Sequence, residues 1–444
     1  MSNSASDDSL ARPDDAGGAV AASPRFEVFA WVLLDWAASA FSTISITLLV
    51  AYIEKVVFAA EPWGVPGGVV WAWTLAVAML VTGLAAPWVA AWADRTHGHH
   101  RALMTSIVAG GAASFLLAAL APSARVLIVV AVVVAAVGFD MAAIFTGSLL
   151  PRIARGAQAD RLSAIGYAAG YAGGALALIL ATRVFAARAS LGLTDAGALR
   201  TAFVIMGGWW IAFSIPSFWM RFGAGHSSAH AATSSGELTG FARALLRGDE
   251  GYGRLGSVLG GAMLILGAMQ TAVSQFSSVA LEEFHLDPPA LVGLVLLVQC
   301  VALPGALAVG WLSTRFGRWP MLSLSLVGWG IVLGSAGFVT TRPQLTAMAV
   351  LLALVLGGAA SVIRAAVAVL APAGRYGATF GLLNVGSKLA GFVASLVFGA
   401  VYAITGHPRA GLAALLVQLI LGWWLLSRAG AGAMEEGKDD RCGA

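Results

Sequence analysis

Three charged side chains fall inside stretches that are otherwise apolar: Asp35 in AWVLLDWAASAF, Asp140 in GFDMAAIFTG and Lys388 in FGLLNVGSK. A charge inside a membrane span costs about 2.5–3.5 kcal/mol, so such residues usually face a cavity or an opposite charge. Two acids and one base point to proton transfer, because burial and a nearby lysine change the proton affinity of a carboxylate in opposite directions. Three alternatives stay open: Lys388 holds a carboxylate of a solute, the charges form a static Asp–Lys pair, or Asp35 accepts hydrogen bonds from Ser, Trp or backbone groups of a neighbouring helix.

The residues around these charges are typical of a membrane protein. The chain has 444 residues, 59% hydrophobic and 11% charged, and a mean hydropathy of +0.84. Apolar stretches of the roughly 20 residues that a spanning helix needs recur along it, without the polar–apolar alternation of a β-barrel. We expect an all-α polytopic membrane protein with twelve transmembrane helices in two six-helix, pseudo-symmetric bundles. The expected spans are 28–53, 68–93, 102–121, 125–150, 162–186, 200–221, 254–281, 289–313, 319–339, 343–368, 376–402 and 407–427.

The longest connection follows the sixth span and is rich in Gly, Ser, Ala and His, as expected of a linker between two halves. Of the 26 basic residues, 18 fall in segments on the N-terminal side of the membrane, seven on the other side, and Lys388 within a span. Basic residues gather in cytoplasmic loops, so both termini are predicted to be cytoplasmic. The predicted organisation is a disordered tail at 1–25, bundles at 26–221 and 254–428 joined by a cytoplasmic linker at 222–253, and a tail at 429–444.

Catalytic and cofactor motifs are missing from the sequence. It has no phosphate-binding loop of the kind that ATP-driven pumps carry, no nucleophile elbow and no H-E-x-x-H zinc motif. The two cysteines have no partner spacing, and the HGHH segment has no second ligand cluster nearby, so no disulfide, metal or cofactor is expected. The basic residues mostly flank spans and do not indicate nucleic-acid binding. An enzyme is not expected; the rival class is a membrane-embedded enzyme or lipid-handling scaffold on a transporter-like fold.

Neutral polar side chains on several spans have two alternative roles. They hydrogen-bond a polar solute in a central cavity, or they hydrogen-bond neighbouring helices. These residues are Gln270, Gln275, Gln299, Asn384, Tyr167 and Tyr171. Gly166, Gly170 and Gly174 form a stripe of small residues on the fifth span, which predicts a close approach of another helix.

Two loops at corresponding places in the halves share a pattern. AAWADRTHGHHR follows the second span and VGWLSTRFGRWP the eighth, and both are short, basic and glycine-containing. Repeated halves with a site between them are typical of transporters. The first loop resembles the G-x-x-x-D-R-x-G-R-R signature of the major facilitator superfamily, with Ala90 at the first glycine and one residue inserted before Gly98; the second has Thr314 in place of the aspartate. The resemblance implies gating roles for Asp94, Arg95, Arg101, Arg315 and Arg318.

Arg364 lies near the cytoplasmic end of the tenth span. It is either a further gating residue or a side chain that extends to the lipid headgroups.

A narrower resemblance covers nearly the whole chain. Asp35 opens the segment DWAASAF, similar to D-W-A-N-S-A-F in the branch of fungal vacuole effluxers and their bacterial relatives; SAIGYAAGYAGG and FGLLNVGSK match later motifs of that branch. The chain departs from the branch at Ala38, where the branch has Asn, and at Ala394-Ser395, where it has Gly-Pro. The resemblance implies a secondary active transporter that works by alternating access on amino acids or related metabolites, with export favoured.

From the residues and the resemblance together we expect proton coupling through Asp35 or Asp140. An uncoupled facilitator is the nearer alternative. The other partners expected are a small-molecule substrate and the lipid bilayer, with the chain a monomer. The excess of Arg over Lys and the richness in Ala suggest a GC-rich bacterial gene, and hence the inner membrane.

Overall fold

The computed structural model describes residues 25–96, 98–154, 157–220, 240–241, 243–245, 247, 252–372 and 375–429. The predicted tails and most of the predicted linker lie outside the described residues. Within the described ranges the chain is helical and contains no strand. Eleven helices are long and apolar enough to cross a membrane, and a shorter apolar helix covers Trp319–Ser335. This confirms the expected all-helical membrane class.

The helices follow the predicted spans closely. In the first half they are α1 (Arg25–Ile44), η1 (Ser45–Leu49), α2 (Val50–Tyr52), η2 (Ile53–Val57), α3 (Gly67–Thr96), α4 (His99–Ala119), α5 (Arg125–Ile153), α6 (Ala157–Ala186), α7 (Asp195–Ser214) and η3 (Ile215–Trp219). In the second half they are α9 (Gly253–Glu282), α10 (Pro288–Phe316), α11 (Arg318–Ser335), α12 (Arg342–Leu370), α13 (Tyr376–Thr405) and α14 (Pro408–Arg428).

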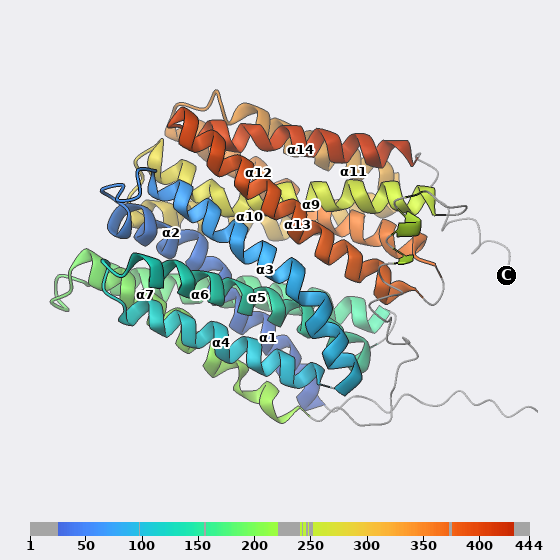
Figure 1. The fold of residues 1–444 in the computed structure, drawn as a ribbon, viewed down its shortest axis with the longest axis horizontal. Coiled ribbons are helices and arrows are strands. Elements are labelled where there is room, and N and C mark those ends of the chain that lie inside the picture. The colour runs from blue at the N-terminus through green and yellow to red at the C-terminus, as the bar shows by residue number, and fades with distance from the viewer. Residues whose placement is uncertain are drawn as a thin grey trace, which may run out of the picture.

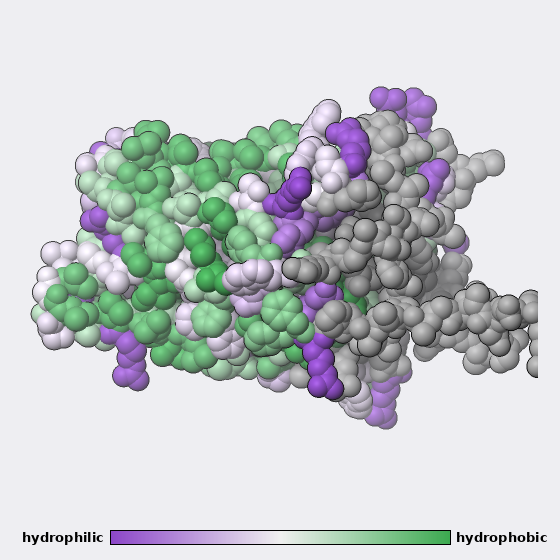
Figure 2. Space-filling view, turned by 90° about the horizontal axis from the view of Figure 1, so that it is seen from below, coloured by the Kyte–Doolittle hydropathy of each residue, from purple (hydrophilic) through white to green (hydrophobic). Residues whose placement is uncertain are grey.

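Figure 1 shows two groups of helices lying side by side, α1–α7 in one and α9–α14 in the other, with α3 and α13 along the boundary between them. We call the end where Arg25 and Arg428 lie the termini end. The opposite end, with the loops at 58–66, 187–194 and 283–287, is called the distal end. Apolar residues cover much of the face seen in Figure 2, and hydrophilic side chains gather toward the ends. This is the surface that a lipid bilayer requires.

The first span is longer than predicted. It was expected to end at residue 53, but its helix continues to Val57 through the two π-helical segments η1 and η2. Hydroxyl side chains compete for the carbonyls in and before η1: Ser45 Oγ donates to Ser42 O at 3.1 Å, and Thr47 Oγ1 to Thr43 O at 2.6 Å. Such competition loosens the regular α-helical ladder. The extension places Glu54 inside the span, where the sequence boundary had left it outside.

The glycine stripe of α6 lies against α1. A Cβ at Gly170 would be 2.8 Å from Ser39 Oγ, and one at Gly174 3.1 Å from Ser39 O. At Gly173, beside the stripe, a Cβ would meet backbone, 2.6 Å from the carbonyl oxygen of Trp36. Two helices therefore meet here at a separation that only glycine permits.

Close contacts between α3 and α13 join the two groups of helices from the distal end to the middle of the bundle. A Cβ at Gly68 would be 2.7 Å from Tyr402 Cε1, one at Gly391 2.8 Å from Met79 Sδ, and one at Gly83 3.1 Å from Leu389 Cδ2. Trp71 Nε1 also donates to Ser274 O of α9 at 3.3 Å. The two groups of helices are thus closely packed against each other at the distal end.

Substitution by Ala is expected to change stability in opposite directions at two glycines, one at the α1–α6 contact and one away from it. Gly173→Ala is expected to lower the free energy of unfolding by about 1–3 kcal/mol, because the new methyl group meets a backbone carbonyl that cannot move aside. Gly147→Ala on α5 meets nothing within 4 Å, so it is expected to raise stability by roughly 0.5–1 kcal/mol. Thermal unfolding of both variants in detergent measures the difference. Equal unfolding temperatures would contradict the tight α1–α6 contact.

Candidate functional site

An ion pair joins the two groups of helices near the middle of the bundle. Lys388 Nζ of α13 lies 2.6 Å from Asp140 Oδ1 of α5. The side chains are 16% and 11% exposed, so each keeps a small accessible surface. Both residues are near the centres of their helices. Two of the three charges singled out in the sequence are therefore in direct contact, although they are 248 residues apart.

Helix α3 brings the two partners within reach of each other. It packs on α5 within its own group and on α13 across the boundary. A Cβ at Gly83 of α3 would be 3.6 Å from Lys388 Cβ, which shows how closely the backbone of α3 approaches this part of α13. The close packing of α3 on both α5 and α13 thus brings the two partners near each other.

Asp35 occupies a different place. Its half-buried carboxylate lies against α6, where Gly166 leaves room for Oδ2. Trp31, one turn earlier, donates from Nε1 to Thr146 O of α5 at 2.9 Å and anchors this part of α1. Among the described residues Asp35 makes no ion pair, and Ser39 bonds only its backbone carbonyl, at 2.7 Å. The structure does not bring Asp35 to Lys388.

The neutral polar residues separate into three environments. Gln270 and Asn384 are exposed, whereas Gln275 is 0% exposed. Neither amide atom of Gln275, nor Nε2 of Gln299, has a hydrogen-bond partner among the described residues. Tyr171 is half-buried, and the side chain of Tyr167 lies outside the described ones. Buried amides usually have partners, so Gln275 and Gln299 are the members of this set that retain unused hydrogen-bonding capacity.

The first signature loop contains a contact that the sequence did not indicate. Asp94 Oδ1 lies 2.9 Å from His99 Nε2, and the His99 ring packs edge-on against Phe145 at 6.2 Å. Arg95 and Arg101 are exposed. The aspartate thus pairs with a histidine at the start of α4. His97 lies outside the described residues.

In the second loop a glycine makes the turn. Gly317 has a φ of 95°, a conformation that residues with a Cβ rarely adopt. The Arg315 guanidinium lies 5.8 Å from the centroids of Trp311 and of Phe316. The side chain of Arg318 lies outside the described ones, and Arg364 is exposed on α12. The gating roles of these residues stay predictions.

Sequence reasoning missed a second set of polar contacts between the halves, at the distal end. Ser278 Oγ of α9 donates to Glu54 Oε1 of η2 at 2.5 Å, and Lys55 Nζ lies 2.8 Å from Glu282 Oε1. The available signal was a glutamate within the apolar stretch VAYIEKVVFAA. The predicted first span ends at residue 53, one residue before this glutamate.

Comparison with known proteins places the chain in a family. Residues 69–432 match the family model described as "Vacuole effluxer Atg22 like". The chain is also 25% identical over 412 residues to an uncharacterized MFS-type transporter, YxiO, of Bacillus subtilis (strain 168), and the match covers 89% of this chain and 93% of that protein.

Solved structures of low sequence identity share the fold. A D-xylose–proton symporter matches with a TM-score of 0.70 at 14% identity, over 92% of this chain and 97% of that one. The human organic anion transporter MFSD10 matches with a TM-score of 0.61 at 16% identity, over 90% and 98%. The fold is therefore that of the major facilitator superfamily, as the signature loop had suggested. The chain belongs to the vacuole effluxer Atg22-like family and is a membrane transporter of the major facilitator type, not an enzyme.

Proposed function

We propose that the chain is a proton-coupled secondary transporter of small polar solutes that bear a carboxylate, amino acids among them. The observation that carries this proposal is the Lys388–Asp140 pair, a contact of 2.6 Å between the two halves near the middle of the bundle. In this fold the halves move relative to each other around a midplane site. An ion pair at that place resists their separation until one of its charges is neutralised or finds another partner.

Proton and solute act on opposite partners of the pair. A proton on Asp140 removes the negative charge and leaves the Lys388 ammonium available. A solute carboxylate then binds the ammonium, which has three hydrogen-bond donors. When the solute leaves, the Lys388 ammonium again needs a negative partner. Asp140 then loses its proton and pairs with Lys388 again. The lysine thus exchanges one carboxylate partner for another, and its charge lacks a partner only between protonation of Asp140 and binding of the solute.

The remaining predicted residues take supporting roles in this proposal. Asp35, with no ion-pair partner among the described residues, is a second candidate for proton binding. Gln275 and Gln299 have unused amide groups that suit a polar solute, and Gln270, Asn384, Tyr167 and Tyr171 are further candidates. Asp94, Arg95, Arg101, Arg315, Arg318 and Arg364 are proposed to act in gating at the termini end.

The direction and location of transport are proposed from the sequence. The bias of basic residues favours a cytoplasmic termini end, so that the distal end faces outside. Because proton and solute bind and leave together in this exchange, the sum of their gradients sets the direction of net transport. The description of the matching family, a vacuole effluxer, is what favours export. A bacterial inner membrane and a monomeric chain complete the proposal.

Transport by purified protein in proteoliposomes tests the proposal. Uptake of a pool of labelled amino acids is expected to exceed equilibrium under an imposed pH gradient. Lys388→Ala is expected to reduce this uptake at least about tenfold, since losing one buried charge contact costs several kcal/mol of binding free energy. Asp140→Asn is expected to abolish the response to the gradient, because the amide cannot take up a proton. Asp195→Asn, which removes an exposed carboxylate paired with Arg188 in the distal loop, is the matched control.

The outcomes separate the alternatives. Uptake that ignores the pH gradient in the wild-type protein would identify an uncoupled facilitator. If folded wild-type protein takes up no amino acid at all, the proposed solute class is wrong.

A double-mutant cycle tests whether the ion pair is formed. Either single change, Asp140→Asn or Lys388→Met, leaves a charge without its partner and is expected to cost about 3–5 kcal/mol of stability. The double variant is expected to lose less than the sum, because no uncompensated charge remains. Thermal unfolding of the four proteins at one pH gives the coupling, and strictly additive losses would show that the two side chains do not interact.

A further inference from the structure

Glu54 is a buried carboxyl at the contact between the two halves. Glu54 as a whole is 2% exposed, although it lies only a few residues from the distal end of the first span. Elements from both halves surround it. A Cβ at Gly67 of α3 would be 2.7 Å from Glu54 Cα, and one at Gly68 would be 3.0 Å from Oε1. The tightness of this packing explains why α3 begins with two glycines.

The carboxyl accepts a hydrogen bond from a hydroxyl and makes no ion pair among the described residues. Ser278 Oγ of α9 donates to Oε1 at 2.5 Å, and the serine is 0% exposed. The other oxygen, Oε2, has no hydrogen-bond partner among the described residues. The titratable groups facing Glu54 are Glu282 of α9, Lys55 of its own segment and Tyr402 of α13. The lysine in this set is already engaged by Glu282.

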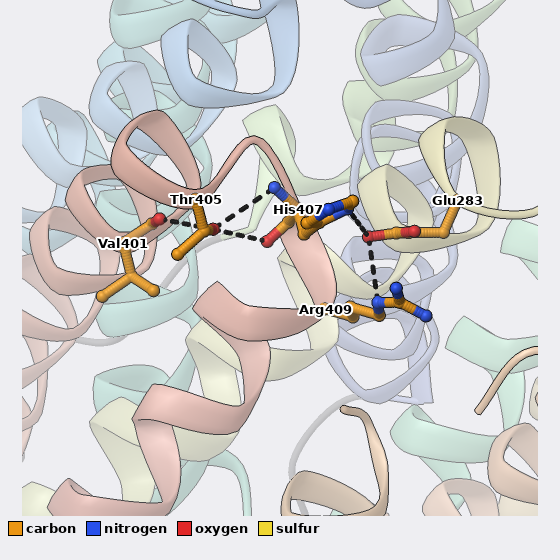
Figure 3. A network of polar contacts seen from close by, with 5 residues as sticks. All are labelled: Glu283, Val401, Thr405, His407 and Arg409. Carbon is orange, nitrogen blue, oxygen red and sulfur yellow. Dashed lines mark hydrogen bonds and ion pairs between the residues drawn. The ribbon is translucent and has the colours of Figure 1, made fainter. Parts of the chain in front are cut away.

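The neighbouring carboxylates show a different arrangement. Glu282 has Lys55 at 2.8 Å. Glu283 has two basic groups, His407 Nδ1 at 3.2 Å and Arg409 Nε at 3.4 Å. Figure 3 shows both side chains pointing at the Glu283 carboxylate, with Thr405 holding the backbone of His407. Of these three acids at the distal end, Glu54 is the most buried and the one with a hydroxyl in place of a cation.

A charged carboxylate without a cation is expensive in a dry interface, whereas a neutral carboxylic acid with one hydrogen bond is tolerated. We propose that Glu54 is a proton-carrying residue of the transport cycle, which holds the distal end closed while it is protonated and lets it open when the proton leaves. The site is the contact of η2 with α9, and the chemistry is a reversible transfer of one proton from the carboxyl group to water on the distal side.

Loss of the proton turns the interaction of Glu54 with α9 from favourable to unfavourable. The neutral acid accepts a hydrogen bond from Ser278 and faces Glu282 without repulsion. The carboxylate carries a charge that repels Glu282 and needs water, and water is supplied when η2 and α9 separate. Deprotonation therefore favours the open distal end, and protonation the closed one. This inference rests on the alternating access of the proposed function but not on the identity of the solute.

Distances across the distal end test the proposal without any solute. Spin labels at Ser190→Cys and Phe338→Cys, both exposed in distal loops of opposite halves, report the separation of the halves in lipid nanodiscs. Cys300→Ser and Cys442→Ser remove the native thiols. The distance between the labels is expected to lengthen as pH is raised. Glu54→Gln, which keeps the shape and accepts the Ser278 hydrogen bond, is expected to stay at the short distance at every pH.

Two further variants separate a proton-carrying role from a structural one. Glu54→Asp keeps a titratable carboxyl and is expected to retain a pH-dependent change in distance. Glu283→Gln, which changes a distal carboxyl that has two basic partners of its own, is expected to leave the change in place. The proposal is overturned if Glu54→Gln responds to pH like the unmutated background, if that background does not respond, or if Glu283→Gln removes the response. Failure of transport in the proteoliposome assay with an intact distance change would instead reject the proposed function alone.

Discussion

The cost of leaving a polar group unpaired in apolar surroundings governs this structure. The backbone avoids that cost by forming helices, which besides closed barrels are the only spanning elements that pair every backbone N–H and C=O group. The same cost explains where the internal charges lie. Asp140 and Lys388 compensate each other, and Lys55 compensates Glu282. Each of these pairs takes one partner from either half, so the electrostatic compensation of one half depends on its contact with the other.

Close helix packing permits these contacts. Glycines on α3, α6 and α13 bring backbones to distances at which a Cβ would collide, and those on α3 and α13 lie along the boundary between the halves. Because lipid supplies no hydrophobic drive between helices, such fitted surfaces and a few polar bonds hold the halves together. A boundary of this kind separates at a smaller cost than an interdigitated core, as a transporter that alternates between two states requires.

Much of the fold could be predicted from the sequence, because long apolar runs are a strong signal. The contact of Asp140 with Lys388 could be anticipated from the sequence, since both charges lie near the middle of apolar segments. Glu54 was missed because π-turns carried the first helix past the apparent end of its apolar run. The pairing of Asp94 with His99 was missed because the loop was interpreted by its resemblance to a signature that has no histidine at this place. The sequence left open which acid lies near Lys388, because it does not fix how each helix is rotated about its axis.

The two inter-half carboxyls, Asp140 and Glu54, differ in what compensates them. Asp140 has a lysine, so its charged form suits the arrangement described here; Glu54 has a serine hydroxyl, so its neutral form does. A proton that binds Asp140 weakens the midplane contact, whereas a proton that leaves Glu54 weakens the distal one. The two contacts therefore respond to protons in opposite senses. In the proposed cycle a proton binds at the midplane while the distal end is closed and one leaves as the distal end opens, and these steps require no residue beyond those that already join the halves.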